Sequence, residues 1–428
     1  MFDYGAVDGG ILNDGGTAFG WVDLLGNDLT VLDASDAPTY VANAVGGYPG
    51  VSGRNGANPA LLQSMSTVTP GSNQATVYAV AEFGGPDWSW YLGTTDSTAL
   101  WFLSVAGKGA VVDTTSGANF AINPSVYGTV VIQFDKTAST AGMTAALYWG
   151  RSRMGWTSDG WTGGNFPAGT LYLLNASNLA FPAYSTTIVR LFGYNTLHTE
   201  AQIQAKIDDL STQYGLNSTT PTRGLYVDGD SISSMYASIN EGWVGHTVLD
   251  GSWDNYVVSS CAYSGKTLAT GYANIATQTA QIRAGIGTNY AIVWLGTNDI
   301  AYSTAITASS LYATMVSEVS YLLAHGFSKV GVVTLLPRGG GFLNGQTTSG
   351  FEAVRETGNA GTGYNDLVRN GAAAHGYTVI DVGSDATIGQ AGQWSNTTYF
   401  VSDHTHLTDA GQSYFFTNYI SPTLTAWN

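Results

Sequence analysis

Gly224-Leu225-Tyr226-Val227-Asp228-Gly229-Asp230-Ser231 is the stretch that decides the fold of the second half of the chain. It begins with apolar residues over the length of a buried strand and ends with a glycine, an acid and a serine, where that strand would stop. Similar apolar runs alternate with helix-like segments from there on; the runs are 290–295, 330–336 and 377–382. Strands that are nearly all apolar, interleaved with helices, predict a parallel sheet covered on both faces.

The clearest helix of this half is expected over 307–325. Its apolar residues recur three or four positions apart, and Gly326 offers a C-terminal stop. The residues of this stripe are Leu311, Met315, Val319 and Leu322. The spacing predicts a helix that buries one face.

Residues 1 to about 195 follow a different pattern. Short runs rich in Val, Tyr, Phe, Trp and Leu lie between Gly, Pro, Asn and Asp residues, which predicts an antiparallel β-sandwich. The runs are 76–83, 97–105, 128–135, 144–150, 170–175 and 185–194. The chain is therefore expected to combine an all-β half with an α/β half.

One helix is expected to close the first half. Thr199 and Gln202 form the pattern of a capping box, and Gly215 offers a stop. Its apolar stripe, which should dock the helix on the sandwich, consists of Ile203, Ile207, Leu210 and Tyr214. The polar stretch 218–222 is interpreted as a linker, which places the domains at 1–217 and 223–428.

The composition limits the partners of this protein. Its 428 residues carry 30 acidic and 14 basic side chains, a net charge of −16, and only 10% of the residues are charged. Such an acidic chain repels phosphate backbones and anionic lipid, so we expect no nucleic-acid partner and no membrane-surface binding. Neutral substrates fit better. Low charge with many Gly, Ser, Thr and Asn residues is common in secreted β-rich proteins.

Cysteine usage and targeting signals add further limits. The single cysteine, Cys261, excludes an intramolecular disulfide and a cysteine metal cluster, and we expect it to be a buried thiol. No stretch approaches the roughly 18 apolar residues of a membrane span. The first residues lack the basic and apolar regions of a secretory signal. We expect an extracellular protein whose signal is not in this chain, with a cell-surface or phage-borne location as alternatives.

Polar residues follow several of the expected strands. Ser231 follows the first, Asn298 follows 290–295, and Asp403 and His406 lie near the end of the chain. Sites of parallel α/β sheets gather at the carboxyl ends of the strands. A serine on the turn that leaves a strand exposes its own N–H and the positive end of a following helix to a substrate. The pattern therefore predicts nucleophilic catalysis by Ser231.

Four motif blocks in the second half resemble those of the SGNH (GDSL-type) hydrolase family. They are Gly229-Asp230-Ser231, Ser264-Gly265, Gly296-Thr297-Asn298-Asp299 and the stretch 403–411, which begins Asp403-His404-Thr405-His406. They occur in the family's order and span nearly all of 222–428. The resemblance implies a three-layer, flavodoxin-like α/β fold and ester hydrolysis.

The resemblance also implies a role for each matched residue. Ser231 would be the nucleophile, His406 its base, and Asp403 the acid that orients the imidazole. The backbone N–H groups of Ser231 and Gly265 and the amide of Asn298 would form the oxyanion hole. The Asp-x-x-His spacing favours His406 over His404 as the base. Zinc bound by these Asp and His residues is the disfavoured alternative, because no other histidines cluster nearby.

Asp230, Asp299 and the segment 338–363 carry further expectations. Asp230 and Asp299 flank motif residues, and we expect them to accept hydrogen bonds from turn backbones. The Gly-rich segment 338–363 is interpreted as a lid or wall of the substrate pocket. The alternative is that it contains a short helix near 351–356.

Residues 1–217 resemble the concanavalin A-like or laminin G-like jelly rolls that are attached to secreted and phage-borne enzymes. The resemblance is clearest at Trp21-Val22-Asp23 with 37–41 and at the closing helix, 200–216. Val51-Ser52-Gly53 stands where such modules often carry an aromatic–acidic pair, so no ligand or metal site is carried over. We expect no cofactor, and no residue pattern supports a structural calcium. Stacking on sugars is the functional interpretation of Trp88, Trp156 and Trp161, against packing as the alternative.

Three functions remain open at this level. The first is a secreted carbohydrate esterase that removes acetyl or similar groups from a polysaccharide. The second is a general carboxylesterase, lipase or polyester hydrolase with a structural β-domain. The third is an adhesin, for example in a phage tail or surface fibre. No feature of the sequence predicts an oligomeric state.

Overall fold

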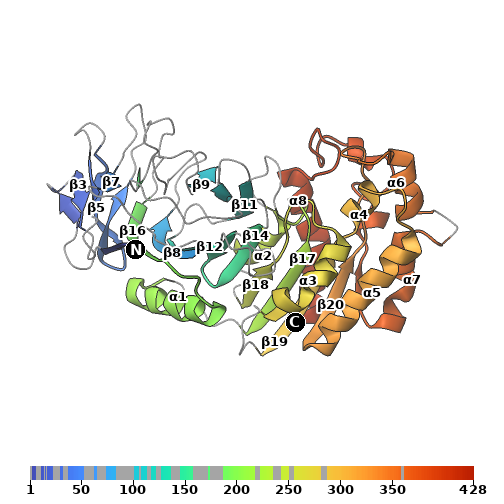
Figure 1. Cartoon of the computed structure of the whole chain (residues 1–428), viewed down its shortest axis with the longest axis horizontal. Helices are drawn as coiled ribbons and strands as arrows, with labels where there is room; N and C mark the ends of the chain where they lie inside the picture. The colour runs from blue at the N-terminus through green and yellow to red at the C-terminus, as the bar shows by residue number, and fades with distance from the viewer. Residues whose placement is uncertain are drawn as a thin grey trace. The chain divides into compact units, whose positions relative to one another are not determined.

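Two units make up the computed structural model of the chain, Met1–Thr220 and Pro221–Asn428. The division falls inside the stretch 218–222 that the sequence suggests as a linker. The residues that the structure describes are 2–5, 11–13, 15, 17–22, 29–31, 37–52, 62–64, 74–82, 101–105, 108–112, 117–121, 127–135, 145–157, 172–173, 187–216, 222–234, 242–249, 255–280, 287–357 and 361–428. Each unit is described by itself below (Figure 1).

The first unit is built from antiparallel strands. One sheet has the order β14-β13-β12-β8-β16-β6-β5, and β1 also pairs with β16. Its strands are β1 (Phe2–Gly5), β5 (Thr39–Val45), β6 (Tyr48–Ser52), β8 (Gln74–Glu82), β12 (Gly128–Asp135), β13 (Ala145–Trp149), β14 (Ser152–Thr157) and β16 (Thr187–Tyr194). The register pairs Val130 with Ala79 on one side and with Trp149 on the other.

Two smaller groups of strands complete the described part of this unit. They have the orders β15-β7-β4-β3-β2 and β11-β10-β9, and their neighbours also pair antiparallel. Their bounds are β2 (Ile11–Asn13), β3 (Ala18–Trp21), β4 (Leu29–Thr30), β7 (Leu62–Ser64), β9 (Trp101–Val105), β10 (Lys108–Val112), β11 (Gly117–Ala121) and β15 (Tyr172–Leu173). Each of the six strand runs expected from the sequence overlaps one of these described strands. Trp88, Trp161 and the side chain of Trp156 lie outside the described residues.

The closing helix of the first unit forms as its end signals predict. α1 (Glu200–Tyr214) begins at a capping box between Thr199 and Gln202 and ends at Gly215, whose φ is 63°. The apolar stripe is buried, and a hydrogen bond of 2.8 Å from the Tyr148 hydroxyl to Glu200 ties the helix to β13. Local capping and apolar spacing were therefore sufficient to place this element.

The second unit contains a parallel sheet with the order β21-β20-β19-β17-β18. Its strands are β17 (Arg223–Gly229), β18 (Tyr256–Ser260), β19 (Thr288–Trp294), β20 (Phe327–Val333) and β21 (Thr378–Ile380). Numbered along the chain this order is 2-1-3-4-5, the flavodoxin-like arrangement that the resemblance implies. β20 ends at Val333 instead of continuing to Leu336, because the amide of Asn365 exchanges hydrogen bonds with the backbone of Leu335 there.

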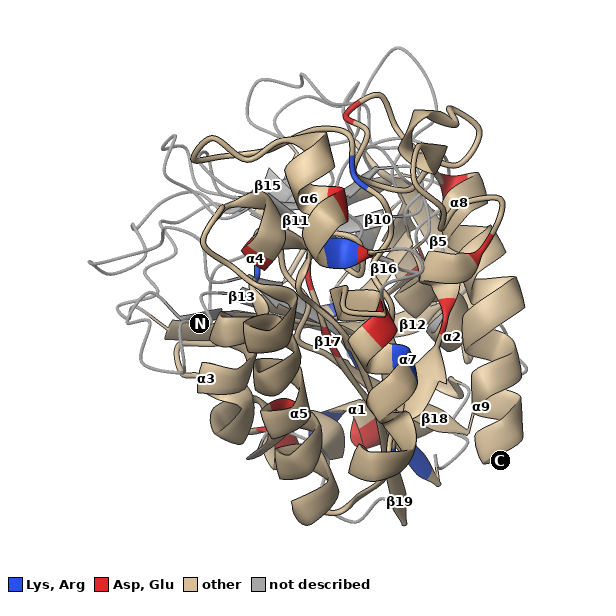
Figure 2. Ribbon diagram, turned by 90° about the vertical axis from the view of Figure 1, so that its right-hand side faces the viewer, with Lys and Arg blue, Asp and Glu red and all other residues tan. Residues whose placement is uncertain are grey.

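Helices cover both faces of this sheet. Figure 2 shows α3 and α5 on one side of it and α2, α8 and α9 on the other, with few charged residues on the ribbon. The helices are α2 (Trp243–Leu249), α3 (Leu268–Ala280), α4 (Thr297–Ala301), α5 (Ala308–Ala324), α6 (Thr348–Arg355), α7 (Tyr364–His375), α8 (Asp409–Phe415) and α9 (Ser421–Trp427), with short turns at η5 (Val382–Ser384), η6 (Gln393–Ser395) and η7 (Phe416–Ile420). None of the described helices combines the length and the apolar character that a bilayer span needs.

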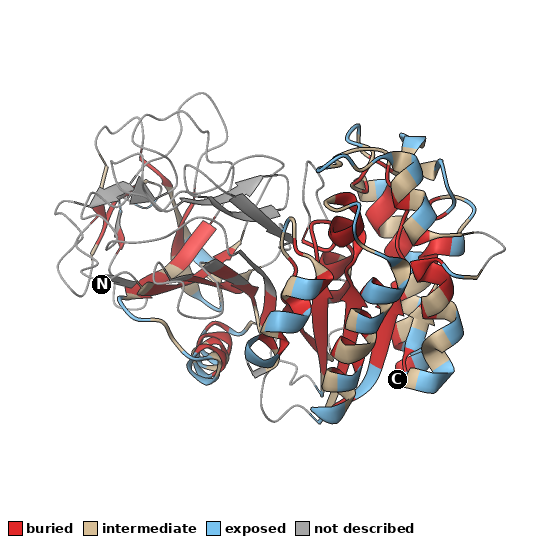
Figure 3. Cartoon of the chain, turned by 45° about the vertical axis from the view of Figure 1, so that its right-hand side comes forward, coloured by how far each residue is buried: buried red, intermediate tan, exposed pale blue. Residues whose placement is uncertain are grey.

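The core of the second unit lies between the sheet and these helices. In Figure 3 its strands are mostly buried, while the helices are exposed on their outer sides. The stripe expected on α5 is buried, and Thr307 caps the start of that helix. Cys261 is buried directly after β18, as expected.

Candidate active site

The topology of the second unit creates a switch point between β17 and β19. From β17 the sheet continues through β18, and from β19 it continues in the opposite direction through β20. Crevices that bind ligands form at the carboxyl ends of strands at such a point. Ser231 follows β17, and Asn298 follows β19 within α4. The sheet order thus explains why two residues far apart in the sequence end at one edge.

Ser231, His406 and Asp403 form a continuous chain of hydrogen bonds. The Ser231 Oγ lies 2.8 Å from His406 Nε2, and His406 Nδ1 lies 2.5 Å from Asp403 Oδ2. Ser231 is buried, and the side chains of His406 and Asp403 are 12% and 41% exposed. The structure therefore brings together the serine, imidazole and carboxylate that the sequence selected, with the serine at the inner end and the carboxylate at the outer end.

The second oxygen of Asp403 is held by its own loop. Asp403 Oδ1 accepts hydrogen bonds from the backbone N–H groups of Thr405, at 2.9 Å, and His406, at 3.0 Å. Burial by itself would raise the pKa of Asp403, but the hydrogen bonds from His406 and from these N–H groups outweigh it and hold the pKa at about 2. Asp403 is consequently an anion at neutral pH, with both oxygens bonded.

The turn after β17 brings Ser231 into position. The N–H groups of Ser233 and Ser234 donate to the carbonyl of Asp230 at 3.1 and 3.0 Å, so residues 231–234 form a turn. Gly229 is needed there, since a Cβ would lie 2.5 Å from the Ser233 hydroxyl. After this turn the described residues resume at 242, and α2 begins at Trp243.

Asp230 and Asp299 bind backbone groups, as expected. Asp230 Oδ1 accepts the N–H of Ile232 at 2.9 Å. Asp299 Oδ2 accepts the N–H of Leu268 at 2.7 Å, at the start of α3. Both carboxylates therefore shape the segments that carry the candidate site residues.

Asp230 titrates unusually for an aspartate. Burial, only partly offset by its hydrogen bond from Ile232 and by the charges of His406 and Arg338, raises its pKa from 3.8 to about 6. The folded state therefore holds a proton that the unfolded chain releases, and folding becomes less favourable as the pH rises from about 4 to about 6. A rise of the pKa from 3.8 to about 6 corresponds to on the order of 3 kcal/mol of unfolding free energy.

Asp230→Asn is expected to remove this loss. The asparagine oxygen can still accept from Ile232, but the side chain no longer has to be buried as an anion. Urea unfolding at pH 4 and pH 7 measures the effect. The difference in the free energy of unfolding, variant minus parent, should be larger at pH 7 than at pH 4. An equal difference at both pH values would contradict the raised pKa.

The proposed oxyanion residues lie on the two neighbouring loops. Asn298 is buried, its Nδ2 donates to the carbonyl of Lys266 at 3.0 Å, and its Oδ1 accepts from Arg338 at 3.1 Å. Gly265 lies in the turn that precedes α3. Within the described residues, no acceptor takes a hydrogen bond from the N–H of Ser231 or Gly265 or from the second N–H of Asn298.

Sequence reasoning missed the two buried cations beside these loops, Lys266 and Arg338. Lys266 forms an ion pair with Asp228 and donates to the carbonyl of Cys261 at 2.9 Å. Burial by itself would lower the pKa of Lys266, but the Asp228 carboxylate outweighs it and raises that pKa. The chain has only 14 basic residues, so a lysine directly after a motif glycine and an arginine two residues after an apolar run were signals that could have been noticed.

The segment 338–363 contains the short helix that was its alternative interpretation, α6. Its first residues contact the loop of the triad: the N–H of Gly339 donates to the His404 carbonyl at 2.8 Å, and the Thr405 hydroxyl donates to the Gly340 carbonyl at 3.2 Å. Residues 358–360 lie outside the described part. That the segment acts as a lid stays a prediction.

His404 is directed away from the hydroxyl that His406 reaches. It has a φ of 59°, and its Nδ1 lies 3.3 Å from the Trp394 carbonyl. In the part of the chain that the structure describes, no three His, Cys, Asp or Glu side chains are grouped so that they could hold a metal ion.

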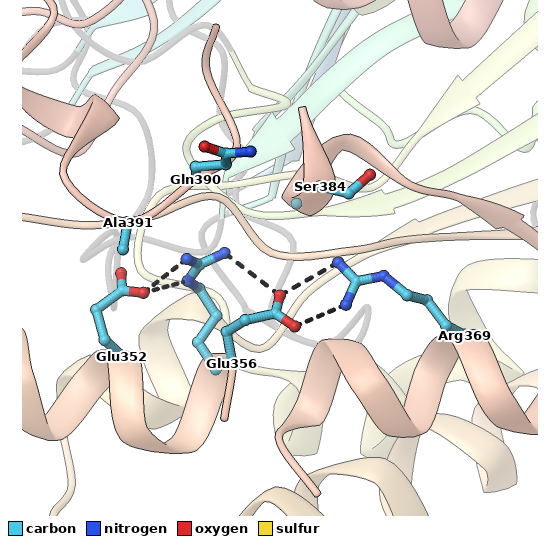
Figure 4. A pocket seen from close by; sticks show the side chains of 8 residues that line it. Glu352, Glu356, Arg369, Ser384, Gln390 and Ala391 are labelled. Atoms are coloured by element: carbon cyan, nitrogen blue, oxygen red, sulfur yellow. Dashed lines mark hydrogen bonds and ion pairs between the residues drawn. The ribbon is translucent and has the colours of Figure 1, made fainter. Parts of the chain in front are cut away.

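A separate cavity of about 400 Å³ lies between α6, α7 and the segment 383–391. Figure 4 shows Glu356 between two arginines, with Arg369 Nη1 at 2.7 Å from its Oε1. The second arginine, Arg355, pairs with Glu352 at 2.6 Å. The charged residues that line this cavity are thus bonded to one another. None of its lining residues belongs to the Ser231–His406–Asp403 chain.

Comparison with known proteins finds a family model that matches most of the second unit. Residues 228–414 match the sequence model of the GDSL-like lipase/acylhydrolase family. No match was found among curated proteins.

Solved structures resemble the chain at low identity. An esterase, EstA, from Pseudoalteromonas sp. is 13% identical, with a TM-score of 0.35, and the match covers 48% of this chain and 97% of that one. A GDSL-like lipase from Bacteroides thetaiotaomicron is 14% identical, with a TM-score of 0.36 and coverages of 51% and 98%. A Bacillus subtilis protein is 16% identical, with a TM-score of 0.37 and coverages of 89% and 85%.

The family match includes all the residues of the hydrogen-bonded chain. Ser231, His406 and Asp403 all lie within 228–414. The second unit is a carboxylic ester hydrolase, and its residues 228–414 are similar to the GDSL-like lipase/acylhydrolase family.

Proposed function

We propose that this protein is a serine esterase that removes acetyl or similar short acyl groups from a polysaccharide through an acyl-enzyme on Ser231. The observation that carries the proposal is the chain of hydrogen bonds from the Ser231 hydroxyl through His406 to Asp403. A hydroxyl with a base at 2.8 Å, and a carboxylate behind that base, is the arrangement that activates a serine.

The first half of the reaction forms the acyl-enzyme. Asp403 accepts the Nδ1–H of His406, which leaves Nε2 as the acceptor for the Ser231 proton. As Oγ bonds to the ester carbonyl carbon, His406 takes that proton and Asp403 stabilises the imidazolium. The tetrahedral intermediate then breaks its bond to the alcohol oxygen, and His406 returns the proton to the leaving alcohol.

The second half releases the acid. Water gives a proton to His406 and attacks the acyl carbon, and the bond to Ser231 Oγ breaks as the proton returns to that oxygen. In both halves the carbonyl oxygen becomes negative, and we assign its stabilisation to the N–H groups of Ser231 and Gly265 and to the Asn298 amide. Within the described residues the N–H groups of Ser231 and Gly265 donate to no acceptor, and the Asn298 amide has one N–H left after its bond to the Lys266 carbonyl, which supports the assignment.

The polysaccharide part of the proposal rests on the first unit. We propose that it is a concanavalin A-like jelly roll that binds glycan. Its antiparallel sheets and the closing helix α1 support this class of module. A net charge of −16 and a low content of charged residues suit a neutral, extracellular substrate better than an anionic one.

Acyl-chain preference tests the substrate class. With 4-nitrophenyl acetate, butyrate and octanoate, kcat/KM is expected to fall by at least about tenfold from acetate to octanoate, because a short acyl pocket excludes added methylenes. Acetate release from acetylated xylan should also be measurable. A preference for octanoate without acetate release would favour the general carboxylesterase or lipase instead.

Binding is best tested without turnover. Full-length Ser231→Ala should still bind acetylated xylan, and deacetylated xylan serves as the control for recognition of the backbone. Glycan binding without any hydrolysis by the parent protein would favour the adhesin. Hydrolysis without glycan binding would leave the esterase and reject the role of the first unit.

A further inference from the structure

Arg338 lies in the segment that leaves β20 at the carboxyl end of the strand. It follows β20 closely and is only 5% exposed. The rings of Tyr302 and Phe342 lie 5.7 and 5.8 Å from its guanidinium carbon. A guanidinium cannot lose its charge in a protein, so burying one is costly unless its donors are bonded.

All three guanidinium nitrogens of Arg338 donate hydrogen bonds. Nε donates to the Gly340 carbonyl at 2.7 Å, and Nη2 donates to the Gly341 carbonyl at 2.8 Å. Nη1 donates to Asn298 Oδ1 at 3.1 Å. Because the guanidinium is rigid and planar, the positions of these three acceptors are fixed relative to one another.

This contact determines which way the Asn298 amide points. An asparagine amide can be turned over so that its oxygen and nitrogen exchange places. Arg338 only donates, and the Lys266 carbonyl at the other end of the amide, 3.0 Å from Nδ2, only accepts. Turning the amide over would place donor against donor and acceptor against acceptor. The pair therefore holds the amide with Nδ2 toward Lys266 and leaves its second N–H for another acceptor.

Arg338 is also connected to the loop that carries Asp403 and His406. Gly340, whose carbonyl Arg338 binds, lies against that loop and also accepts from the Thr405 hydroxyl at 3.2 Å. A Cβ on Gly340 would lie 2.5 Å from the Asp403 carbonyl oxygen, so the two segments are in close backbone contact. Arg338 thus contacts, directly or through one residue, both the proposed oxyanion donor and the loop that carries Asp403 and His406.

We propose that Arg338 is a positioning residue for ester hydrolysis, which holds the Asn298 amide in the orientation that donates to the oxyanion and joins that donor to the Asp403–His406 loop. The proposal rests on the oxyanion role assigned to Asn298 above. It assigns to Arg338 no contact with substrate. Its effect should therefore appear in kcat and depend on the presence of the Asn298 amide.

A double-mutant cycle tests this dependence. Asn298→Ala should lower kcat by about 10²- to 10³-fold, as loss of one oxyanion donor does in comparable sites. Arg338→Met should lower kcat by about 10- to 100-fold, with KM changed less than about threefold, because the amide is present but no longer held. Arg338→Met combined with Asn298→Ala should be no slower than Asn298→Ala alone, within about threefold.

Arg355→Met is the matched structural control. Arg355 is also buried, and its Nη1 donates to two backbone carbonyls, those of Leu335 at 3.0 Å and Gly389 at 3.1 Å. Asn298 is not among the partners of Arg355. Arg355→Met should lower the melting temperature and leave the kcat of the folded enzyme within about twofold. If Arg338 were only structural, its variant would behave in the same way, and the proposal would be overturned.

Arg338→Lys keeps the measurement possible if the methionine variant does not fold. Lysine retains the positive charge but cannot bind three separated acceptors in one plane, so kcat should still fall and the loss should again disappear in the Asn298→Ala background. Parent-like kcat in Arg338→Lys, or a loss that multiplies with that of Asn298→Ala, would reject the proposal. Activity retained in Ser231→Ala would instead reject the proposed function, so the two failures are distinguishable.

Discussion

Ser231→Ala is expected to lower kcat for ester hydrolysis by about 10⁶-fold, the loss found when a triad serine is removed from a comparable enzyme. The change removes the hydroxyl that lies 2.8 Å from His406 Nε2, while Asp403 and the backbone donors keep their places. Hydrolysis of 4-nitrophenyl acetate, with active-site titration to exclude traces of parent enzyme, measures the effect. Stability should change little, because only one oxygen is removed.

Ser234→Ala is the matched control for this experiment. Ser234 lies on the same turn and donates its backbone N–H to Asp230 at 3.0 Å, a bond that alanine keeps. Its kcat should stay within about twofold of the parent enzyme. If Ser231→Ala retained more than about 1% of the activity, Ser231 would not be the nucleophile and the proposed mechanism would be wrong.

Asp403→Asn is expected to lower kcat by about 10⁴-fold with almost no change in geometry. Asp403 Oδ1 accepts two backbone N–H groups, at 2.9 and 3.0 Å, so an asparagine must place its oxygen there and its NH₂ against His406 Nδ1. Nδ1 then has to accept a hydrogen bond, and the proton moves to Nε2. An imidazole protonated at Nε2 cannot accept the proton of Ser231.

The tautomer explanation has its own controls. His406→Ala and the double variant with Asp403→Asn should have equal kcat, because the carboxylate acts only through the imidazole. The melting temperature of Asp403→Asn should stay close to that of the parent, since the side chain is 41% exposed. A loss of activity smaller than about tenfold would mean that Asp403 does not set the tautomer.

Short-range patterns in the sequence predicted several elements closely. The capping box at Thr199 and Gln202 and the stop at Gly215 gave the ends of α1 to within a residue, because capping involves neighbours in the chain. The stripe of α5 gave its buried face for the same reason. Apolar runs also marked β17 and β19.

Other elements were missed because their signals were weak or depended on contacts elsewhere. The hairpin β5–β6 turns at Gly46 and Gly47, which have φ values of 58° and 85°. Its strands contain Ala, Asn and Pro and lack a regular alternation of apolar and polar residues. β20 ends three residues before its apolar run does, because Asn365, about 30 residues further on, binds the backbone of Leu335.

Asp403 and His406 could be selected from the sequence because they too are close neighbours in the chain. Asp403 and His406 lie three residues apart, so one loop can hold both, and the Asp-x-x-His spacing marks them. That Ser231 meets His406, 175 residues later in the chain, was implied only by the resemblance to a family. The cations were missed because neither Lys266 nor Arg338 has a spacing rule that connects it to Asn298.

The residues of this protein that interact with near neighbours could thus be placed from the chain alone: the helix caps, the buried stripes, the sharp turn after β17 and the Asp403–His406 pair. The order of the strands, and with it the meeting of Ser231, Asn298 and His406 at one edge, came from packing between distant segments. Arg338 shows the difference most clearly. Its three hydrogen-bond partners include one residue 40 positions earlier, and only the folded sheet brings that residue within 3.1 Å.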